Sequence, residues 1–536
     1  MPNYNPVEVE IWRHLLASVS EEMGATLERA AFSPNIKERR DHSCAIFNAQ
    51  GEMLAQAAHI PVHLGAMPLM MESLLNLQPS LEWRPDEMWI CNDPRVGGTH
   101  LPDLTLIAPV FLYEDTENEA NFPQNELIGF VANRAHHADI GGIAPGSLPL
   151  STSLYQEGLI LPPLRLVRDD KLQQEIVALI CANSRTPEER RGDLSAQVGA
   201  NAVGKERFRE LFRQSGRELF TQRTTETLLY AEAVLNTILL RISNGTYTAL
   251  DVLDGDGTGA IDIPIRVALT VEEGKLTFDF TGSALQTEGS ANATEAITRS
   301  VCYYLVRCLA PPDLPTNSGC FRAITVIAPA GTIVNADYPA AVATGNVETS
   351  QRILDTILQA LAKALPQEIP ACSQGTMNNL LIGGYDLERQ RPFAYYETIA
   401  GGAGASSEGD GASAIHTHMT NTLNTPIEVL ETHYPLRVVQ LEIADNTGGK
   451  GKFNGGNGLI RHLEILVDAH VSLITERRTH TPPGANGGED GLPGHNEIIL
   501  PDGTRHSLPP RWSEKVSAGT QILVRTPGGG GWGKPT

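Results

Sequence analysis

Positive charge is scarce in this sequence. Its 536 residues include 41 Lys and Arg against 63 Asp and Glu, which gives a formal net charge of -22. Proteins that bind nucleic acids present clustered Lys and Arg to the phosphates. The strongest basic clusters here are two short arginine pairs, 190–191 and 477–478. The composition therefore argues against a nucleic-acid partner.

Long apolar runs are also missing. No segment approaches the roughly 20 apolar residues of a membrane span, and residues 1–32 lack the uninterrupted apolar core of a secretory signal. The seven cysteines are scattered and form no CxxC pair, so neither a zinc ribbon nor a redox dithiol is indicated. We expect a cytoplasmic protein with reduced thiols and no membrane contact.

Motifs for nucleotide binding and for a serine nucleophile are absent. There is no GxxxxGK[ST] loop for phosphates and no GxSxG nucleophile elbow. The Gly-rich stretches lack the strand–GxGxxG–helix context of a dinucleotide site. The sequence therefore predicts no ATP site of its own.

Glycine and proline are abundant, with 50 and 35 residues, whereas aromatic residues make up only 6%. This mixture is typical of a turn-rich enzyme with many short strands. We expect an α+β, multi-domain fold of β-rich mixed sheets with flanking helices and Gly-rich loops. The expected regions are an N-terminal α/β region (1–244), a β-rich middle region with helices (245–370) and a Gly-rich β and loop region (371–536).

The N-terminal segment is predicted to be an amphipathic helix, since Ile11, Leu15, Val19 and Met23 recur at helical spacing. Three further tracts are predicted to be helical. The longest, 194–240, is rich in Glu, Arg, Leu and Ala, and residues 184–193 read as its polar lead-in. Residues 294–309 and 349–365 have the apolar content of buried helices.

The most informative stretch is 92–142, in which two short apolar runs flank a polar segment. Residues 104–112 and 127–132 are each short enough to be a buried strand, and 114–125 between them is acidic and Asn-rich. Two strands joined by such a loop most simply form an antiparallel hairpin. Folding about the middle of the loop brings Asp103 opposite His136.

This hairpin would gather metal-ligand side chains at its open end. His100 and Asp103 lie at its entry, and His136, His137 and Asp139 lie at its exit. Imidazoles and carboxylates that converge in this way suit a divalent transition-metal ion. The alternative is that these histidines are hydrogen-bonded structural residues. Two clusters predicted to meet in space favour a functional site.

Further candidates lie outside the hairpin. His59 and His63 are additional possible ligands, and residues 38–41 (ERRD) form a dense charged cluster. Arg134, close to His136, could pair with an anionic substrate group.

A second polar constellation lies near residue 420. If the segment is a strand, His416 and His418 face the same side and could share one ligand. Asn421 and Asn424 would add amide donors and acceptors. The alternative is a polar loop with incidental histidines.

Six long motifs, taken in order, resemble the hydantoinase B family, which includes the C-terminal half of 5-oxoprolinase and the corresponding subunit of acetone carboxylase. These motifs are ERRDHSCAIFN, HIPVHLGAMP, NDPRVGGTHLPDLTLIAPVF, NRAHHADIGGIAPGS, HTHMTNTLNTPIEVLE and TPGGGGWGKP. The resemblance covers essentially the whole chain.

The resemblance implies a division of labour within a hetero-oligomer. A hydantoinase A-type partner with an actin-like ATPase fold would use ATP to phosphorylate the substrate, and this chain would complete the reaction. The resemblance also implies a divalent ion, with Mn, Fe, Zn and Co not distinguished. Its implied ligands are Glu38, His100, Asp103 and one of His136 or His137, of which the hairpin favours His136.

We therefore expect the metal-bearing B-type subunit of an ATP-dependent cyclic amidase, which converts 5-oxoproline to glutamate or opens a hydantoin. In this hypothesis Asp139, Arg134 and His137 assist catalysis. The residues expected to hold the substrate are His416, His418, Asn421 and Asn424. Two alternatives stay open: a subunit of an ATP-dependent ketone carboxylase, and a scaffolding subunit whose metal is structural.

Overall fold

A seven-stranded antiparallel sheet organises the N-terminal part of the computed structural model, which describes residues 5–535 apart from 59, 78–81 and 113–125. Its strand order is β2-β1-β5-β4-β3-β6-β7. The strands are β1 (His42–Asn48), β2 (Met53–Ala58), β3 (Met88–Cys91), β4 (Asp103–Leu112), β5 (Glu126–His136), β6 (Leu164–Arg168) and β7 (Lys171–Leu172).

Both faces of this sheet are buried. Successive side chains of each strand point to opposite faces, so each strand contributes to two cores. Cys44 and Ile46 face a core formed with the long helices, whereas Ala45 and Phe47 face the core of the middle region. The helices that cover the two faces, or flank the sheet, are α1 (Pro6–Ala30), α2 (Pro34–Lys37), α3 (Ala66–Asn76), α4 (Gln174–Ala182), α5 (Pro187–Ser215) and α6 (Arg217–Leu239).

The predicted hairpin is confirmed with its register. Strands β4 and β5 pair antiparallel, and Asp103 lies opposite His136. The second strand is longer than predicted, because β5 also pairs with β1 as far as Ala135. The predicted loop, 114–125, lies outside the described residues.

The predicted helical tract 194–240 is two helices. They are interrupted at Gly216, whose φ of 76° lies in the left-handed region that favours glycine. Helix α5 already begins at Pro187, in the segment predicted to be a polar lead-in, because proline is well suited to the first helical turn.

The middle region is a four-stranded sheet covered by two helices. Its strand order is β11-β10-β9-β8. The elements are β8 (Gly245–Gly255), β9 (Ile261–Glu272), β10 (Lys275–Asp279), β11 (Ile324–Ile327), α7 (Glu295–Leu309) and α8 (Ser350–Leu361). Both predicted buried helices are therefore present, and a π-helical turn, Gly345–Thr349, leads into α8.

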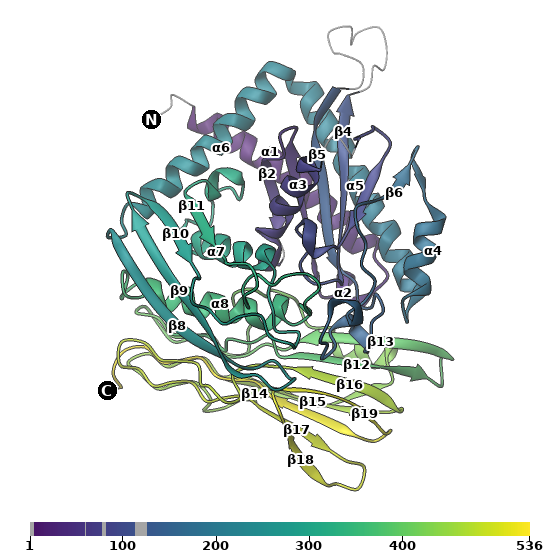
Figure 1. The fold of residues 1–536 in the computed structure, drawn as a ribbon, viewed down its shortest axis with the longest axis vertical. Coiled ribbons are helices and arrows are strands. Elements are labelled where there is room, and N and C mark those ends of the chain that lie inside the picture. Colours follow the sequence, from purple (N-terminus) through teal and green to yellow (C-terminus); the bar gives the residue numbers. More distant parts are fainter. Residues whose placement is uncertain (1–4, 59, 78–81, 113–125, 536) are drawn as a thin grey trace.

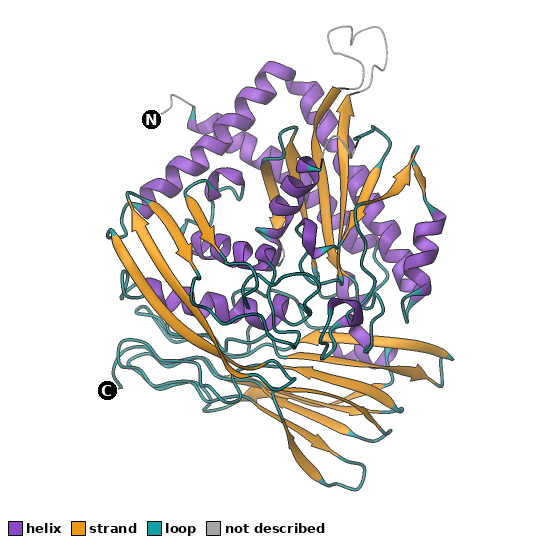
Figure 2. Cartoon of the chain, viewed as in Figure 1, coloured by secondary structure: helices purple, strands orange, loops and turns teal. Residues whose placement is uncertain are grey.

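Two stacked sheets form the C-terminal part (Figure 2), with apolar side chains of both in one core. Their strand orders are β13-β12-β16-β19 and β14-β15-β20-β17-β18. The elements are β12 (Asn379–Asp386), β13 (Arg391–Thr398), α9 (Ile427–His433), β14 (Leu436–Ala444), β15 (Gly458–Ile465), β16 (Ala469–Ile474), β17 (His495–Ile499), β18 (Arg505–Leu508), β19 (Arg511–Val516) and β20 (Gln521–Arg525).

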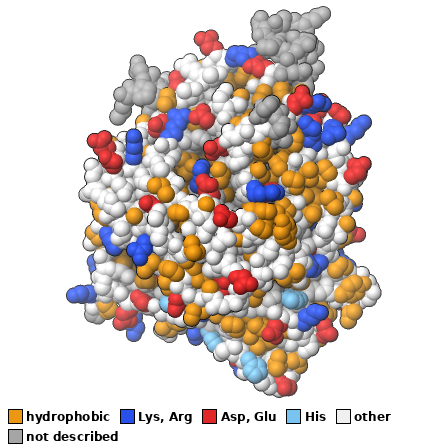
Figure 3. Space-filling view, viewed as in Figure 1, with side chains coloured by type: hydrophobic (Ala, Val, Ile, Leu, Met, Phe, Trp, Pro, Cys, Tyr) orange, Lys and Arg blue, Asp and Glu red, His pale blue; other side chains and the backbone are white. Residues whose placement is uncertain are grey.

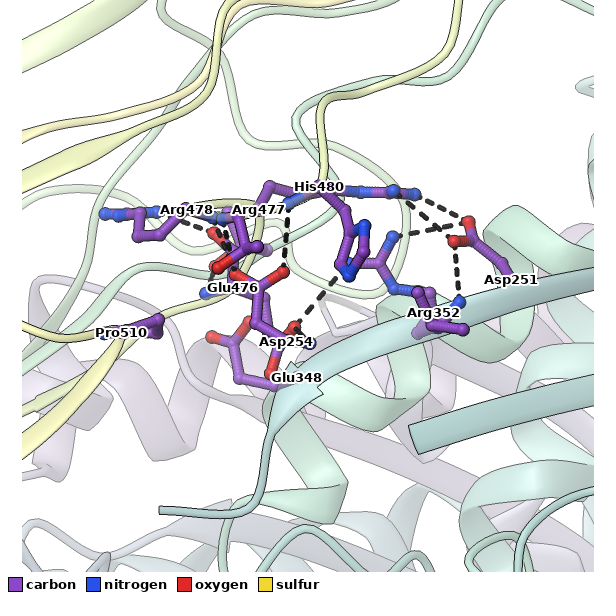
Figure 4. Close-up of polar contacts among 12 residues, drawn as sticks. Asp251, Asp254, Glu348, Arg352, Glu476, Arg477, Arg478, His480 and Pro510 are labelled. Carbon is purple, nitrogen blue, oxygen red and sulfur yellow. Dashed lines mark hydrogen bonds and ion pairs between the residues drawn. The ribbon is translucent and has the colours of Figure 1, made fainter. Parts of the chain in front are cut away.

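A buried ionic network joins the middle and C-terminal regions (Figure 4). Asp251 on β8 accepts hydrogen bonds from Arg352 on α8, at 3.3 Å, and from Arg477 beyond β16, at 2.8 Å. Arg477 also donates to Asp355, at 2.6 Å. Burial of these groups is tolerated because the charges are paired. The predicted domain boundaries near 245 and 370 stay a prediction.

The fold is thus a mixture of helices and several antiparallel sheets, as predicted. Among the described residues, no helix combines the length and the apolar character needed to cross a bilayer. On the face in Figure 3, Lys and Arg side chains are scattered among acidic ones and form no continuous basic surface.

Candidate metal centre

Three metal-ligand side chains meet where β4 begins and β5 ends, next to β13 (Figure 1). The His100 Nε2 atom lies 3.0 Å from His136 Nδ1 and 3.1 Å from Asp103 Oδ1, and the last two atoms are 3.2 Å apart. All three residues are at most 2% exposed. Donor atoms bound to one ion at about 2.0–2.2 Å lie roughly 3 Å from one another. The triad therefore has the spacing of a shared ligand set.

The turn before β4 places His100 at this point. Gly97 has a φ of 87°, and a Cβ atom on Gly98 would lie 2.3 Å from the Asn92 carbonyl oxygen, so the chain can double back only with glycine there. Asn92 then fixes the turn, because its amide donates to the Leu101 carbonyl at 2.7 Å.

The protonation of the triad also points to a cation. His100 Nδ1 lies 3.2 Å from the Ala343 carbonyl, which can only accept, so a neutral His100 carries its proton on Nδ1. Its Nε2 lone pair then faces an Asp103 oxygen. Two acceptors at 3.1 Å repel each other unless a metal ion or a proton lies between them.

The pKa shifts agree with an anionic carboxylate among imidazoles. Burial lowers the pKa of His100, but the Asp103 carboxylate outweighs it and raises this pKa. Burial raises the pKa of Asp103, but His100, His136 and His63 outweigh it and hold this pKa well below its usual range. Burial lowers the pKa of His136, which favours the neutral form that binds metals. The His136 Nε2 atom is buried and has no hydrogen-bond partner among the described residues.

The triad borders a cavity of about 20 Å³, which has room for one ion or one water molecule. Its lining combines polar groups with an apolar surround from distant segments. The lining residues are Asp41, Ile60, Val62, His63, His100, Asp103, His136, Asn346, Val347, Met377, Tyr396, Thr398, Met419, Thr420 and Thr422. Two imidazoles and carboxylates of this kind fit a divalent transition-metal ion.

The fourth predicted ligand, Glu38, does not line this cavity. It is half-buried at the end of α2, where its charge acts on His433. The chain then turns at Arg40, whose φ is 56°, and Asp41 lines the cavity instead. The Asp41 charge raises the pKa of His136, against the larger effect of burial. Asp41 is therefore a better candidate than Glu38 for the fourth ligand.

A hydroxyl and an imidazole hold the second oxygen of Asp103. Thr99 Oγ1 donates to Asp103 Oδ2 at 2.6 Å, and His63 Nε2 lies 3.6 Å from the same oxygen. His63 Nδ1 lies 3.0 Å from Ser43 Oγ. Contacts of this kind orient a metal-binding carboxylate.

The residues predicted to be catalytic lie around the cavity but do not line it. His137 turns toward α5, where its Nε2 atom lies 2.9 Å from Gln197 Oε1. Asp139 forms an ion pair with Arg185 at 2.9 Å and accepts from the Gly146 amide at 3.2 Å. Arg134 donates to Thr105 at 2.7 Å.

These contacts tie the three side chains to the elements around the site. Arg134 also donates to the Gly97 carbonyl, at 3.3 Å, in the turn that carries His100. Burial lowers the pKa of His137 to about 4, so this ring is neutral.

The segment 416–424 is a loop and not a strand, so its two histidines do not share a face. His416 Nε2 lies 3.5 Å from Asn424 Oδ1, and the His418 ring packs edge-on to Tyr304. Burial lowers the pKa of each histidine to about 4. Asn421 and Asn424 are exposed. The segment does reach the cavity, through Met419, Thr420 and Thr422.

A chain of contacts on the side of the cavity formed by β12, β13 and the π-helical turn was not predicted from the sequence. Tyr396 stacks on His136, and its hydroxyl donates to Asn379 Oδ1 at 3.0 Å. The Asn379 amide donates to Glu348 Oε1 at 2.7 Å, and Glu348 lies in the π-helical turn. The same turn places Asn346 Nδ2 3.1 Å from His100 Nε2. A π-helical turn is frequent at functional sites.

The comparisons with known proteins cover the whole chain. The family model described as hydantoinase B/oxoprolinase matches residues 5–535. An uncharacterized protein of Methanocaldococcus jannaschii is 41% identical over 532 residues, which are 99% of this chain and 91% of that protein. 5-oxoprolinase 1 of Arabidopsis thaliana is 36% identical over 555 residues, 98% of this chain but 42% of that protein. The chain thus spans about two fifths of the plant enzyme.

Two solved structures have the same fold. The ATP-dependent caprolactamase from Pseudomonas jessenii superposes with a TM-score of 0.90 at 25% identity, over 99% of this chain and 92% of the matched chain. Nucleotide-free acetone carboxylase superposes with a TM-score of 0.88 at 19% identity, over 99% of this chain and 76% of that chain. On the match of the family model along its length, this chain belongs to the hydantoinase B/oxoprolinase family.

Proposed function

We propose that this chain is the metal-binding part of an ATP-dependent enzyme that opens cyclic amides, with 5-oxoproline as the favoured substrate and glutamate as its product. The observation that carries the proposal is the buried triad of His100, Asp103 and His136. The comparisons support a cyclic amide as the substrate, since relatives are named 5-oxoprolinase and a structural neighbour is an ATP-dependent caprolactamase.

The ATP chemistry would come from an A-type ATPase polypeptide. This chain has no phosphate-binding loop motif, and it matches less than half of the length of the plant 5-oxoprolinase. It matches 91% of the archaeal relative, so some members of the family have about this length. The family resemblance implies that the ATPase phosphorylates the amide oxygen, which turns a resonance-stabilised amide into an electrophilic carbon with a good leaving group.

The residues of this chain would then hold the metal and control the surroundings of the reaction. His100, Asp103 and His136 would bind the ion, with Asp41 as the candidate fourth ligand. A divalent ion at this position supplies Lewis-acid polarisation of the reacting oxygen. Thr99 and His63 orient the Asp103 carboxylate.

The apolar part of the wall would protect the activated substrate. Ile60, Val62, Val347, Met377 and Met419 surround the polar groups and exclude bulk water from the cavity. Exclusion of water strengthens the electrostatic interactions in the site and suppresses premature hydrolysis of a reactive intermediate.

The test is glutamate release from 5-oxoproline and ATP, first by the metal-loaded chain alone and then by the chain co-purified with an A-type ATPase. We expect turnover only in the complex, with one glutamate per ATP. ATP hydrolysis without glutamate, in a complex with bound metal, would reject 5-oxoproline, and a hydantoin would be assayed next.

The ketone carboxylase alternative shares the fold, as the likeness to acetone carboxylase shows. It makes a different demand, because carboxylation consumes bicarbonate. ATP consumption that requires both a ketone and bicarbonate would favour this alternative over the amidase.

A further inference from the structure

One polar side chain in the cavity has no role in holding the metal. Asn346 is 5% exposed and lines the cavity. Its Nδ2 atom lies 3.1 Å from His100 Nε2, and its Oδ1 atom is buried without a hydrogen-bond partner among the described residues. A buried amide oxygen without a partner is costly, so such an atom at a functional site calls for an explanation.

A metal ion on His100 Nε2 would remove the one partner that the Asn346 amide has in this cavity. As a metal ligand His100 would be a neutral imidazole with its proton on Nδ1, toward the Ala343 carbonyl, and a single lone pair on Nε2. A lone pair that binds an ion no longer accepts a hydrogen bond. In the metal-loaded site both ends of the Asn346 carboxamide are therefore free for a molecule in the cavity.

The backbone around Asn346 is fixed, so its amide cannot turn away easily. The Ser350 hydroxyl donates to the Asn346 carbonyl at 2.8 Å. At the preceding residue, a Cβ atom on Gly345 would lie 1.9 Å from the Asn292 carbonyl oxygen, so the two backbones are in contact there. The Gly345 amide also donates to the Ser290 carbonyl at 3.1 Å.

We propose that Asn346 binds the ring amide of the cyclic substrate. This inference rests on the proposed function and names the residue that would select the substrate class. In a small lactam ring the amide is cis, so its N–H and C=O point to the same side. A primary carboxamide presents one N–H and one C=O in the same way. Asn346 can therefore donate to the ring oxygen and accept from the ring N–H, and the ring keeps both groups after phosphorylation on oxygen when its nitrogen carries a proton.

Three other polar side chains of the wall are already engaged. The hydroxyls of Thr398 and Thr422 contact each other at 2.7 Å, and the Tyr396 hydroxyl is engaged by Asn379. The cavity as it stands admits only an ion or a water molecule, so the substrate displaces part of the wall. Met377 and Met419 are the adaptable part, because methionine side chains are unbranched and flexible.

The test compares a lactam with its N-methyl analogue, which lacks the ring N–H. The binding of 5-oxoproline and of N-methyl-5-oxoproline to the metal-loaded chain is measured by calorimetry, for the wild type and for Asn346→Leu, which has a similar size and no polar group. We expect the wild type to bind the parent lactam about tenfold or more tightly than the analogue. Asn346→Leu should bind the two equally.

A second measurement uses the complex with the A-type ATPase and the ratio of kcat/KM for the two lactams. The ratio should fall toward one in Asn346→Leu while the metal content of the variant stays that of the wild type. Lactam turnover with an unchanged ratio in the variant would overturn the role of Asn346 and leave the proposed function standing. A wild-type complex that neither binds nor opens any lactam would overturn the proposed function, and this inference with it.

Discussion

Tyr396 stacks on His136, with ring centroids 4.9 Å apart and an angle of 25° between the ring planes. The Arg39 guanidinium lies 4.7 Å from the centroid of the same tyrosine ring and donates to the Tyr396 carbonyl at 2.8 Å. The Tyr396 hydroxyl is held by Asn379. A residue of β13 thus orients an imidazole at the end of β5.

This relationship predicts that the Tyr396 hydroxyl affects metal binding. Tyr396→Phe keeps the stacked ring but loses the hydrogen bond to Asn379. Contacts that orient a ligand typically contribute 10–100-fold to metal affinity, and we expect about a tenfold loss. Metal titration against a competing chelator measures it.

The adjacent tyrosine is a matched control for this experiment. Tyr395 points to the other face of β13, where its hydroxyl donates to Glu397 at 2.7 Å. Tyr395→Phe removes the same atom from a buried tyrosine and should leave metal affinity unchanged. Equal losses in the two variants would mean that the effect is general destabilisation.

The two neighbouring histidines offer a second matched pair. His136→Ala removes a member of the triad, so we expect metal affinity to fall more than about 100-fold, beyond the usual effect of an orienting residue. His137→Ala removes a ring that contacts Gln197, and the variant should retain its metal. Metal content after dialysis, measured by elemental analysis, distinguishes them. Retention by His136→Ala together with loss by His137→Ala would reverse the assignment.

Asp139 is expected to act on stability. It is fully buried and accepts hydrogen bonds from Arg185 and from the Gly141 and Gly146 amides. Asp139→Asn removes the ion pair, and we expect the free energy of unfolding to fall by about 2 kcal/mol with metal content unchanged. Denaturant unfolding checks this. If activity disappeared while stability and metal content stayed at wild-type values, Asp139 would have the direct role in chemistry expected from the sequence.

The Glu348 carboxyl predicts a pH dependence of stability. Burial, with repulsion from Glu476, raises its pKa from 4.5 to about 8, although Arg478 and Arg511 also face it. Between these two values the folded chain keeps a proton that the unfolded chain has lost. The contribution of Glu348 to stability is therefore fully present below about pH 4.5 and is lost as the pH rises through about 8.

Glu348→Gln isolates this contribution, because glutamine keeps the size and the acceptor oxygen but cannot ionise. We expect the variant to gain stability relative to the wild type by about 1–3 kcal/mol when the pH is raised from 5.5 to 8.5. Urea unfolding of both proteins at the two pH values measures the difference. Asp355, whose pKa is also raised to about 8, contributes equally to both proteins and cancels. A difference independent of pH would show that Glu348 is ionised in the folded chain.

The sequence predicted the part of the site that depends on local pattern. Apolar runs flanking a polar segment gave the hairpin, and its register gave the contact of Asp103 with His136. It also preferred His136 over His137 on the same ground. The family resemblance implied Glu38 as a ligand, and no pattern in the sequence indicated Asp41 for this role. The position of Asp41 depends on a positive φ at Arg40, and a non-glycine residue gives no sign of that conformation.

The rest of the site depends on contacts between distant segments. Asn346, Met377 and Tyr396 come from three separate elements, and no periodicity or spacing relates them to the hairpin. The polar side chains of segment 416–424 predicted a ligand site, with a polar loop as the alternative. Its loop conformation, however, turns Thr420 and Thr422 into the cavity and its histidines elsewhere.

The separation in sequence between the hairpin and the wall residues has a consequence for how the site forms during synthesis. The three donors of the hairpin have been synthesised by residue 136, whereas the last wall residue, Thr422, follows on the order of 300 residues later. At about 5–20 residues per second this interval lasts tens of seconds. During that time the donors lack the wall that later encloses them. An ion that reached the nascent chain in this interval would bind before the wall closes, so the metals available during synthesis would influence which ion the site holds.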